Sequence, residues 1–333
     1  MDPIRVAVVG AGHLGKHHAR LLHGLDEARL AYVVDSRADV AEQVATAYGA
    51  ESSTDFRALV GAVDAACVVT PTETHREIAG FLLENGVDVL VEKPIAPTEQ
   101  AGRELVEIAR EHGRILQVGH VERFNSALGA LKDLDLAPRY IESQRLAPFS
   151  FRSVDIGVVL DLMVHDLDIV LDLIGSEVVS VEAFGGAVFT PAEDMATATL
   201  KFENGAIAQL TASRIALKPM RRMRIFSPDG YVSLDFHEAQ GTLIQKSPSW
   251  DYEKLDLRSV DTSKIDDLWR FVFDGLLKVE QIQLDSGNPL RDELSSFLGC
   301  VRDRAEPVVS GEQGCRAVAL ACRVLESIKG KTW

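Results

Sequence analysis

The sequence is short of basic charge and of long apolar runs. Its 333 residues hold 35 Lys and Arg against 50 Asp and Glu, which gives a formal net charge of -15 at pH 7. A chain without a basic excess lacks the surface that general nucleic-acid binding requires, so we expect no nucleic-acid partner. No stretch approaches the ~18 apolar residues of a membrane-spanning helix, so we expect no membrane partner.

Cysteine is also scarce, and its positions do not resemble a metal site. The cysteines are scattered without the paired spacing of zinc ligands, and we predict no metal. We expect them to be reduced thiols in the core of a cytoplasmic protein. Residues 1–10 lack the basic and long apolar regions of a secretion signal, so we expect no such signal. The four cysteines are Cys67, Cys300, Cys315 and Cys322.

The remaining composition is that of a globular protein of two domains. Hydrophobic residues make up 46% of the chain and charged residues 26%, which is typical of a globular fold. A chain of 333 residues is too long for one ordinary core and suits two. No internal repeat or low-complexity linker interrupts it.

A glycine-rich turn follows the first apolar run. Residues 4–9, IRVAVV, lead directly into GAGHLG, in which Gly10, Gly12 and Gly15 fit the pattern G-x-G-x-x-G. The first glycine permits a tight turn, the second leaves room for a pyrophosphate, and the third lets helix and strand pack closely. An amphipathic helical pattern follows, whose N-terminal amides favour an anion. The sequence therefore predicts a dinucleotide-binding unit.

A carboxylate ends the second apolar run. Asp35 stands twenty residues after Gly15, where a carboxylate binds the adenosine ribose hydroxyls and repels a 2′-phosphate. Arg37 lies two residues later and favours the 2′-phosphate of NADP. We predict NAD as the cofactor, with NADP as the alternative that Arg37 leaves open.

Three further apolar runs alternate with helical patterns, around 74–85 and 98–112. This alternation predicts a parallel sheet covered on both faces, and we predict a Rossmann domain over residues 1–122. Ligands bind outside the carboxyl ends of such strands. We expect the runs at 64–70, 87–93 and 114–120 to end at one such edge. The residues that they place there are Thr70-Pro71, Glu92-Lys93-Pro94 and Gly119-His120.

The pattern changes after residue 122. Runs of alternating polarity, with turn signals at 203–205 and 228–230, predict a mostly antiparallel sheet with one covered face. Asn288-Pro289 and the pair Ser310 and Gln313 mark the starts of two C-terminal helices. We predict an α/β protein with an N-terminal Rossmann domain and a C-terminal α+β domain on an open, mostly antiparallel sheet, over residues 123–333. That domain should bind substrate and form the oligomer.

An apolar helix predicted at 157–174 carries one polar stripe, formed by Asp161, His165, Asp168 and Asp172. Polar groups on a buried helix need partners or a water-filled cleft. Histidine titrates near neutrality and takes a proton from an alcohol, and Asp161 lies one turn before it. The alternative is a core histidine satisfied by hydrogen bonds between helices.

Two groups of polar residues have weaker support as substrate ligands. Arg123 and Asn125, just past the last Rossmann strand, are candidates for the substrate edge, or else form an interdomain salt bridge and a helix cap. The second domain also concentrates cations that would suit a diphosphate, or that form a solvated strand face. They are Arg214, Lys218, Arg221, Arg222 and Arg224.

Five motifs occur in the order GAGHLG, TPTETH, EKP, GHVERFN and DLMVHDLD. Together they resemble the glucose–fructose oxidoreductase, inositol dehydrogenase and rhizopine-catabolism (Gfo/Idh/MocA) family over the full chain. The resemblance implies a catalytic set of Lys93, Asp161 and His165. It also implies a cis peptide before Pro94, which would turn Lys93 into the cleft. Met163 departs from the pattern, since many members have glycine in that turn.

The resemblance and the pattern together give candidate ligands. The substrate-binding candidates are Lys93, Arg123, Asn125, Asp161, His165, Arg214 and Lys218. The cofactor-binding candidates are Gly10, Gly12, His13, Leu14, Gly15, Asp35, Arg37, Thr70, Pro71, His75, Glu92 and Lys93.

Within the family, GHVERFN and residues 151–168 resemble the UDP-N-acetylglucosamine 3-dehydrogenases. This implies an NAD-dependent dehydrogenase that oxidises C3 of a small-molecule nucleotide sugar. The alternatives are a dehydrogenase of a free polyol or sugar, and a non-enzymatic NAD(H)-binding regulator. An open sheet face is normally buried against another subunit, so we expect a homodimer or homotetramer.

Overall fold

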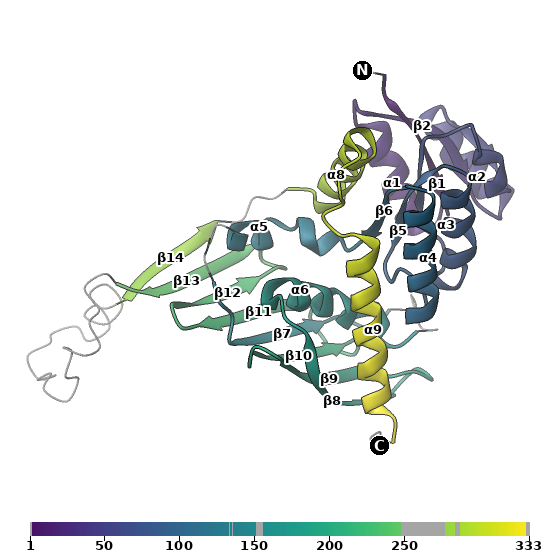
Figure 1. Ribbon diagram of the computed structural model, residues 1–333. Helices are drawn as coiled ribbons and strands as arrows, with labels where there is room; N and C mark the ends of the chain where they lie inside the picture. The colour runs from purple at the N-terminus through teal and green to yellow at the C-terminus, as the bar shows by residue number, and fades with distance from the viewer. Residues whose placement is uncertain are drawn as a thin grey trace, which may run out of the picture. The chain divides into compact units, whose positions relative to one another are not determined.

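The computed structural model describes residues 2–132, 134, 136–150, 156–247, 277–283 and 287–330. The chain forms two compact units (Figure 1), here called the first and second unit. The first contains Met1–Phe124 and Asn288–Glu326, and the second contains Asn125–Gly287 and Ser327–Trp333. The sequence-based division assigned everything after residue 122 to one domain, whereas residues 288–326 belong with the first unit.

The first unit is built on the predicted parallel sheet. All neighbouring strands are parallel, in the order β3-β2-β1-β4-β5-β6. The order reverses at β1 and β4, the kind of point at which such sheets bind ligands. The strands are β1 (Ile4–Val9), β2 (Ala28–Val34), β3 (Glu51–Ser53), β4 (Ala65–Val68), β5 (Asp88–Glu92) and β6 (Leu116–Gly119).

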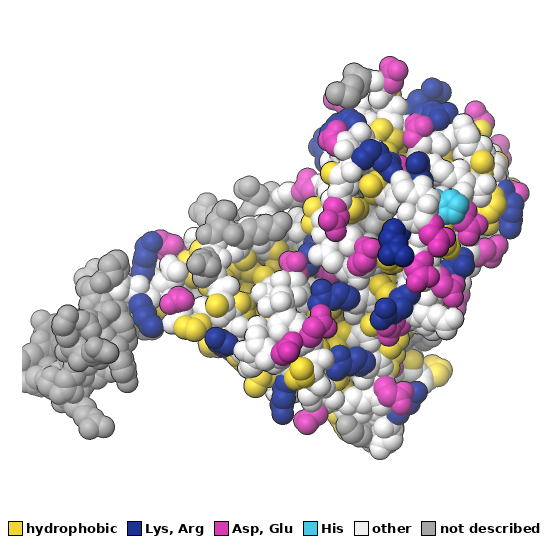
Figure 2. All heavy atoms as spheres, in the orientation of Figure 1, with side chains coloured by type: hydrophobic (Ala, Val, Ile, Leu, Met, Phe, Trp, Pro, Cys, Tyr) yellow, Lys and Arg dark blue, Asp and Glu magenta, His cyan; other side chains and the backbone are white. Residues whose placement is uncertain are grey.

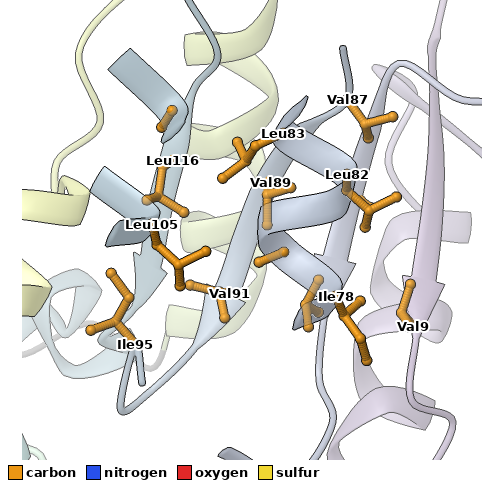
Figure 3. Packing of buried hydrophobic residues seen from close by; sticks show 14 of the residues in the cluster. Val9, Ile78, Leu82, Leu83, Val87, Val89, Val91, Ile95, Leu105 and Leu116 are labelled. Carbon is orange, nitrogen blue, oxygen red and sulfur yellow. The ribbon is translucent and has the colours of Figure 1, made fainter. Parts of the chain in front are cut away.

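Helices cover both faces of this sheet. Alternate side chains of β1 enter two cores, because successive strand residues point to opposite faces. Val6 and Val8 pack with residues of α1 (His13–His23), α2 (Ala38–Tyr48) and α8 (Pro289–Asp303). Ala7 and Val9 pack with α3 (His75–Glu84), α4 (Glu99–Glu111) and α9 (Gly311–Ile328). Figure 3 shows this second core, with Ile78 and Leu82 of α3 against the strands. The 3-10 turns are η1 (Phe56–Leu59), η2 (Thr72–Thr74) and η3 (Val121–Phe124).

The two C-terminal helices begin where the sequence predicts. The Asn288 side chain accepts a hydrogen bond of 3.2 Å from the Arg291 amide. At the second start, the Ser310 amide donates to Gln313 Oε1 (2.9 Å) and the Gln313 amide donates to Ser310 Oγ (3.4 Å). This reciprocal pair is a capping box, which satisfies amides that the first turn leaves without partners.

The second unit contains an eight-stranded sheet in the order β14-β13-β12-β11-β7-β10-β9-β8. Only β7 and β10 pair in parallel, so the predicted antiparallel character is confirmed. The sequence analysis did not predict β7 or β14. The strands are β7 (Tyr140–Leu146), β8 (Val178–Gly186), β9 (Met195–Phe202), β10 (Ile207–Ser213), β11 (Met220–Ser227), β12 (Gly230–Asp235), β13 (Gln240–Lys246) and β14 (Leu277–Gln283).

A helical segment packs on one face of this sheet (Figure 1). It begins as a π-helix, Val159–Met163, and continues as α6 (Val164–Ile174), whereas the sequence predicted one regular helix. The short helix α5 (Ser126–Lys132) precedes the sheet in the chain. No helix among the described residues is long and apolar enough to cross a membrane.

Candidate active site

The glycine turn of the first unit is shaped for a dinucleotide. Gly10 has φ +95°, and a Cβ there or at Gly15 would overlap backbone atoms. A Cβ at Gly12 would meet nothing within 4 Å, so open space lies beside the start of α1. Only glycine permits the turn and the close helix packing, and the open space suits a pyrophosphate next to helix amides.

A cavity of about 630 Å³ extends from this turn along the carboxyl ends of the strands. Its lining combines backbone, polar and apolar groups, as an adenosine site requires. Four other cofactor candidates line it together with Gly10 and Gly12, namely Asp35, Arg37, Thr70 and Pro71. The lining includes Gly10, Gly12, Asp35, Arg37, Phe56, Thr70, Pro71 and Ile78.

Asp35 ends β2 at the edge of this cavity and is 8% exposed. Its Oδ2 accepts from the Ala11 amide (2.9 Å), and its Oδ1 accepts from the Arg37 amide (3.0 Å) and Nε (3.2 Å). Burial acts to raise the pKa of Asp35, but these hydrogen bonds outweigh it and hold the pKa below its usual range. A carboxylate offers about four acceptor positions, so capacity remains for a ribose hydroxyl.

Lys93 follows β5 directly and is half-buried. The peptide between Lys93 and Pro94 is cis, as the resemblance implies. Beside it, Glu92 Oε1 lies 3.0 Å from His18 Nε2, and Oε2 accepts from the Lys93 amide at 3.2 Å. Burial acts to raise the pKa of Glu92, but the bond to His18 and the nearby Lys93 charge keep it low. A fixed negative charge therefore lies next to Lys93.

His75 joins two of the strand-end loops. Its Nδ1 lies 3.0 Å from the Pro94 carbonyl oxygen and its Nε2 lies 2.9 Å from that of Thr70. Burial lowers the pKa of His75. The side chain was predicted as a cofactor ligand, and in the structure its two ring nitrogens face these protein carbonyls.

A buried acid behind this edge was not predicted. Glu293 of α8 is fully buried, and its carboxyl oxygens have no hydrogen-bond partner among the described residues. Burial, reinforced by the charge of Glu92, raises the pKa of Glu293 well above its usual value. No local pattern marks it, because its neighbours in space come from distant strands.

In the second unit, the π-helix carries Asp161 and the first turn of α6 carries His165. Both side chains are half-buried, and Asp168 is buried while Asp172 is exposed. The predicted stripe is therefore accessible at Asp161 and His165, as expected for a site. Short π-helical segments recur at functional sites. Met163 is fully buried, so it packs into the core.

A buried ion pair with a side chain of β7 holds this helix in place. Arg145 of β7 donates from Nε to Asp166 Oδ2 (3.0 Å) and from a terminal nitrogen to Oδ1 (2.9 Å). Both side chains are buried, and the parallel, two-bond geometry is the strongest that arginine and carboxylate form. Asp166 directly follows His165 on α6, and no sequence pattern indicated its partner because β7 itself was not predicted.

The cation cluster of the second unit does not form one site. Arg214 is buried and donates to the Ile156 carbonyl oxygen (2.6 Å). Arg222 is paired with Asp235 (2.7 Å) and Arg224 with Glu142 (2.9 Å) across neighbouring strands. Arg222 and Arg224 are therefore exposed on one strand and paired with carboxylates of neighbouring strands, whereas Arg214 is buried.

The remaining candidates lie on turns and helix starts. Asn125 Oδ1 accepts from the Ala127 amide (3.0 Å) at the start of α5, which is the predicted cap. Lys218 is exposed between β10 and β11, and His13 and Leu14 are exposed on the first turn of α1. The described residues contain no group of three or more His, Cys, Asp or Glu arranged to hold a metal ion.

Charge on the visible surface is mixed. On the face shown in Figure 2, Lys and Arg side chains lie among Asp and Glu side chains. On this face no large patch of one sign is seen, so an anion there would have to be bound by individual donors.

Comparison with known proteins places both parts of the chain in one family. Residues 4–120 match the oxidoreductase family with an NAD-binding Rossmann fold, and residues 127–233 match the GFO/IDH/MocA C-terminal domain. These are the parts that carry the glycine turn, Lys93, Asp161 and His165.

Individual relatives agree with this assignment. The UDP-N-acetylglucosamine 3-dehydrogenase of Acidithiobacillus ferrooxidans is 40% identical over 270 residues, covering 78% of this chain and 85% of that protein. Its solved structure superposes with a TM-score of 0.87 at 34% identity, covering 98% of each chain. The scyllo-inositol 2-dehydrogenase (NAD(+)) of Bacillus subtilis is 33% identical over 230 residues, covering 63% of this chain and 67% of that protein. The chain therefore belongs to the Gfo/Idh/MocA family of NAD-dependent oxidoreductases.

Proposed function

We propose that this protein oxidises the C3 hydroxyl of UDP-N-acetylglucosamine to a 3-keto nucleotide sugar. The observation that carries the proposal is the similarity to a UDP-N-acetylglucosamine 3-dehydrogenase over 85% of that protein, at 40% identity. Its structure also matches this chain at a TM-score of 0.87. The proposal rests on this similarity and not on the arginine stretch, because Arg214, Arg222 and Arg224 contact acceptors within the second unit.

The proposed chemistry uses the catalytic set that the family resemblance implies, Lys93, Asp161 and His165. Bound NAD supplies the hydride acceptor. His165 removes the hydroxyl proton as general base, because imidazole titrates near neutrality. Lys93 donates a hydrogen bond to the same oxygen and stabilises its developing negative charge. Asp161 orients His165 and supports the imidazolium that forms.

We propose that Asp35 selects NAD through the ribose hydroxyls. Asp35→Ala is expected to weaken NAD binding about tenfold or more, the scale of a hydrogen bond to a charged group. NADP binding should fall less, because the change also releases Arg37, whose Nε now bonds to Asp35. Fluorescence titration with both cofactors measures the two affinities.

Asp39→Ala is the matched control for this change. Asp39 is an exposed carboxylate on the first turn of α2 and does not line the cavity, so its loss should leave both affinities unchanged. A wild-type protein that binds NADP about tenfold more tightly than NAD (~1.4 kcal/mol) would contradict the assignment of Asp35.

The substrate is tested by single turnover with stoichiometric enzyme and NAD. Oxidation at C3 is unfavourable with NAD⁺ alone, so product should accumulate only when a sink such as an aminotransferase removes it. We expect UDP-N-acetylglucosamine to raise the melting temperature and to give the absorbance of enzyme-bound NADH. UDP alone should raise the melting temperature without reduction, which separates nucleotide binding from oxidation.

A free polyol is the second candidate substrate. It is favoured by the similarity to a scyllo-inositol 2-dehydrogenase over 67% of that protein. In the same assay, reduction of bound NAD by scyllo-inositol or myo-inositol, with no effect of UDP-N-acetylglucosamine, would replace the nucleotide sugar as the substrate.

We also propose a homo-oligomer, with the sheet face opposite α6 as the contact. Aligned positions of six strands form an apolar row on that face, in which Phe226 is 39% and Val279 is 41% exposed. An exposed apolar row on a sheet marks an association surface. Light scattering of the holoenzyme should give the mass of a dimer or tetramer, and a monomer mass would contradict this. The row consists of Ile207, Tyr140, Phe226, Tyr231, Ile244 and Val279.

The cysteines support the proposal of a cytoplasmic location. All four are free, and three of them are buried. Free thiols suit a reducing compartment. Fractionation of the native source, followed by detection of the protein in the membrane-free extract, checks the location.

A further inference from the structure

The helical segment that carries Asp161 and His165 is anchored at its start by Glu193. This residue lies in the loop between β8 and β9. Its backbone carbonyl accepts from the Val158 amide (3.0 Å), and its Oε1 accepts from the Val159 amide (3.1 Å). Amides in the first turn of a helix have no partner within the helix, so Glu193 satisfies them and fixes where the helix begins.

The next residue, Asp194, is fully buried and fixed in its loop. Its Oδ2 accepts from the amides of Val188 (2.7 Å), Phe189 (2.6 Å) and Thr190 (3.0 Å), and its Oδ1 accepts from Thr190 Oγ1 (2.7 Å). Burial acts to raise the pKa of Asp194, but these bonds outweigh it and lower the pKa to about 2. Asp194 is therefore a permanent, immobile negative charge.

Arg214 lies between this charge and Asp161. Its side chain is 5% exposed, its Nε lies 3.9 Å from Asp194 Oδ1, and a terminal nitrogen lies 3.9 Å from Asp161 Oδ2. The Ile156 carbonyl oxygen, five residues before Asp161, accepts from the same terminal nitrogen at 2.6 Å. The Arg214 amide also donates to the Asp194 carbonyl oxygen at 3.0 Å. The guanidinium thus donates to the Ile156 carbonyl oxygen and lies within 4 Å of a carboxylate oxygen of both Asp194 and Asp161.

We propose that Arg214 is a positioning residue, fixed by Asp194, that holds the Asp161 carboxylate in one orientation on the helical turn before His165. The inference rests on the proposed roles of Asp161 and His165. A cation close to a carboxylate attracts it, and the rigid planar fork of arginine limits where that carboxylate can lie. This gives Arg214 a different role from the predicted one of substrate ligand.

A double-mutant cycle tests the proposal. Arg214→Met is expected to lower kcat about 10²-fold, the usual effect of a misplaced catalytic group, with little change in the KM for NAD. The same change made in an Asp161→Asn background should cost little more, because the two residues act through one another. Arg214→Lys, which keeps the charge but not the fork, should recover part of kcat.

The outcomes separate this inference from the proposed function. If Asp161→Asn alone leaves kcat unchanged, the proposed role of Asp161 is wrong. If Asp161→Asn lowers kcat, but Arg214→Met costs the same factor with and without Asp161, Arg214 does not act through Asp161 and the inference is wrong. Should Arg214→Met fail to fold, Arg214→Lys is carried through the same cycle. Arg103→Met, which removes an exposed arginine paired with Glu99 on α4, is the control and should leave kcat unchanged.

Discussion

Lys93→Met and His165→Ala are each expected to lower kcat by about 10²-fold or more, the scale on which acid–base groups contribute. Without His165 the substrate hydroxyl keeps its proton as the hydride leaves, and without Lys93 the oxygen loses a charged hydrogen-bond donor. Steady-state kinetics with the substrate identified by single turnover measures both effects.

Cofactor affinity should survive both changes, because neither side chain lines the cavity beside the glycine turn. His237→Ala and Lys201→Met are matched controls, since both residues are exposed on the strands and turns of the second unit. Turnover within about twofold of wild type, less than 0.5 kcal/mol of barrier, in either catalytic variant would remove that residue from the mechanism.

Asp166→Ala is expected to lower the free energy of unfolding by about 3–5 kcal/mol, because it removes the carboxylate that is paired with the buried Arg145 guanidinium. The pair is bidentate at 3.0 and 2.9 Å, and both side chains are almost inaccessible. Urea denaturation followed by circular dichroism measures the loss.

The double change Arg145→Met with Asp166→Leu should cost much less than Asp166→Ala alone, because replacing both partners of a buried pair by apolar groups leaves no charge without a partner. Asp172→Ala is the control on the same helix, since Asp172 is exposed. A double variant that is as unstable as Asp166→Ala would show that the pair is required for packing and not for charge balance.

The features that were predicted correctly depend mainly on residues that are neighbours in the sequence. The glycine turn, its flanking strand and helix, and the helix starts at Asn288 and Ser310 depend on neighbouring residues only, so short patterns reveal them. The placement of Thr70 and Lys93 at one edge was predicted from the rule that the carboxyl ends of parallel strands lie at the same edge of a sheet. None of these predictions needed a contact between distant segments.

The features that were missed all depend on distant partners. Arg214 was predicted as a substrate ligand in a cation-rich stretch, because nothing in its own segment shows that Asp194 and Ile156 lie against it. Glu293 is indistinguishable in sequence from an exposed helix residue. The sequence also does not show that α8 belongs to the first unit, because its amphipathic pattern indicates that one face is covered but not which sheet covers it.

Because α8 belongs to the first unit, residues 125–287 of the second unit are inserted within the first. The core beneath β1 is completed by Leu294, Phe297 and Leu298 of α8, and the opposite core by Val309 and Val318. Domains near the N-terminus generally fold as they leave the ribosome, yet here residues 1–124 emerge with both sheet faces incompletely covered. The first unit therefore cannot complete its two cores until residues 288–326 have been synthesised, after residues 125–287. Proteolytic loss of residues 288–326 would therefore destroy the dinucleotide site at the opposite end of the sequence before it harmed the eight-stranded sheet.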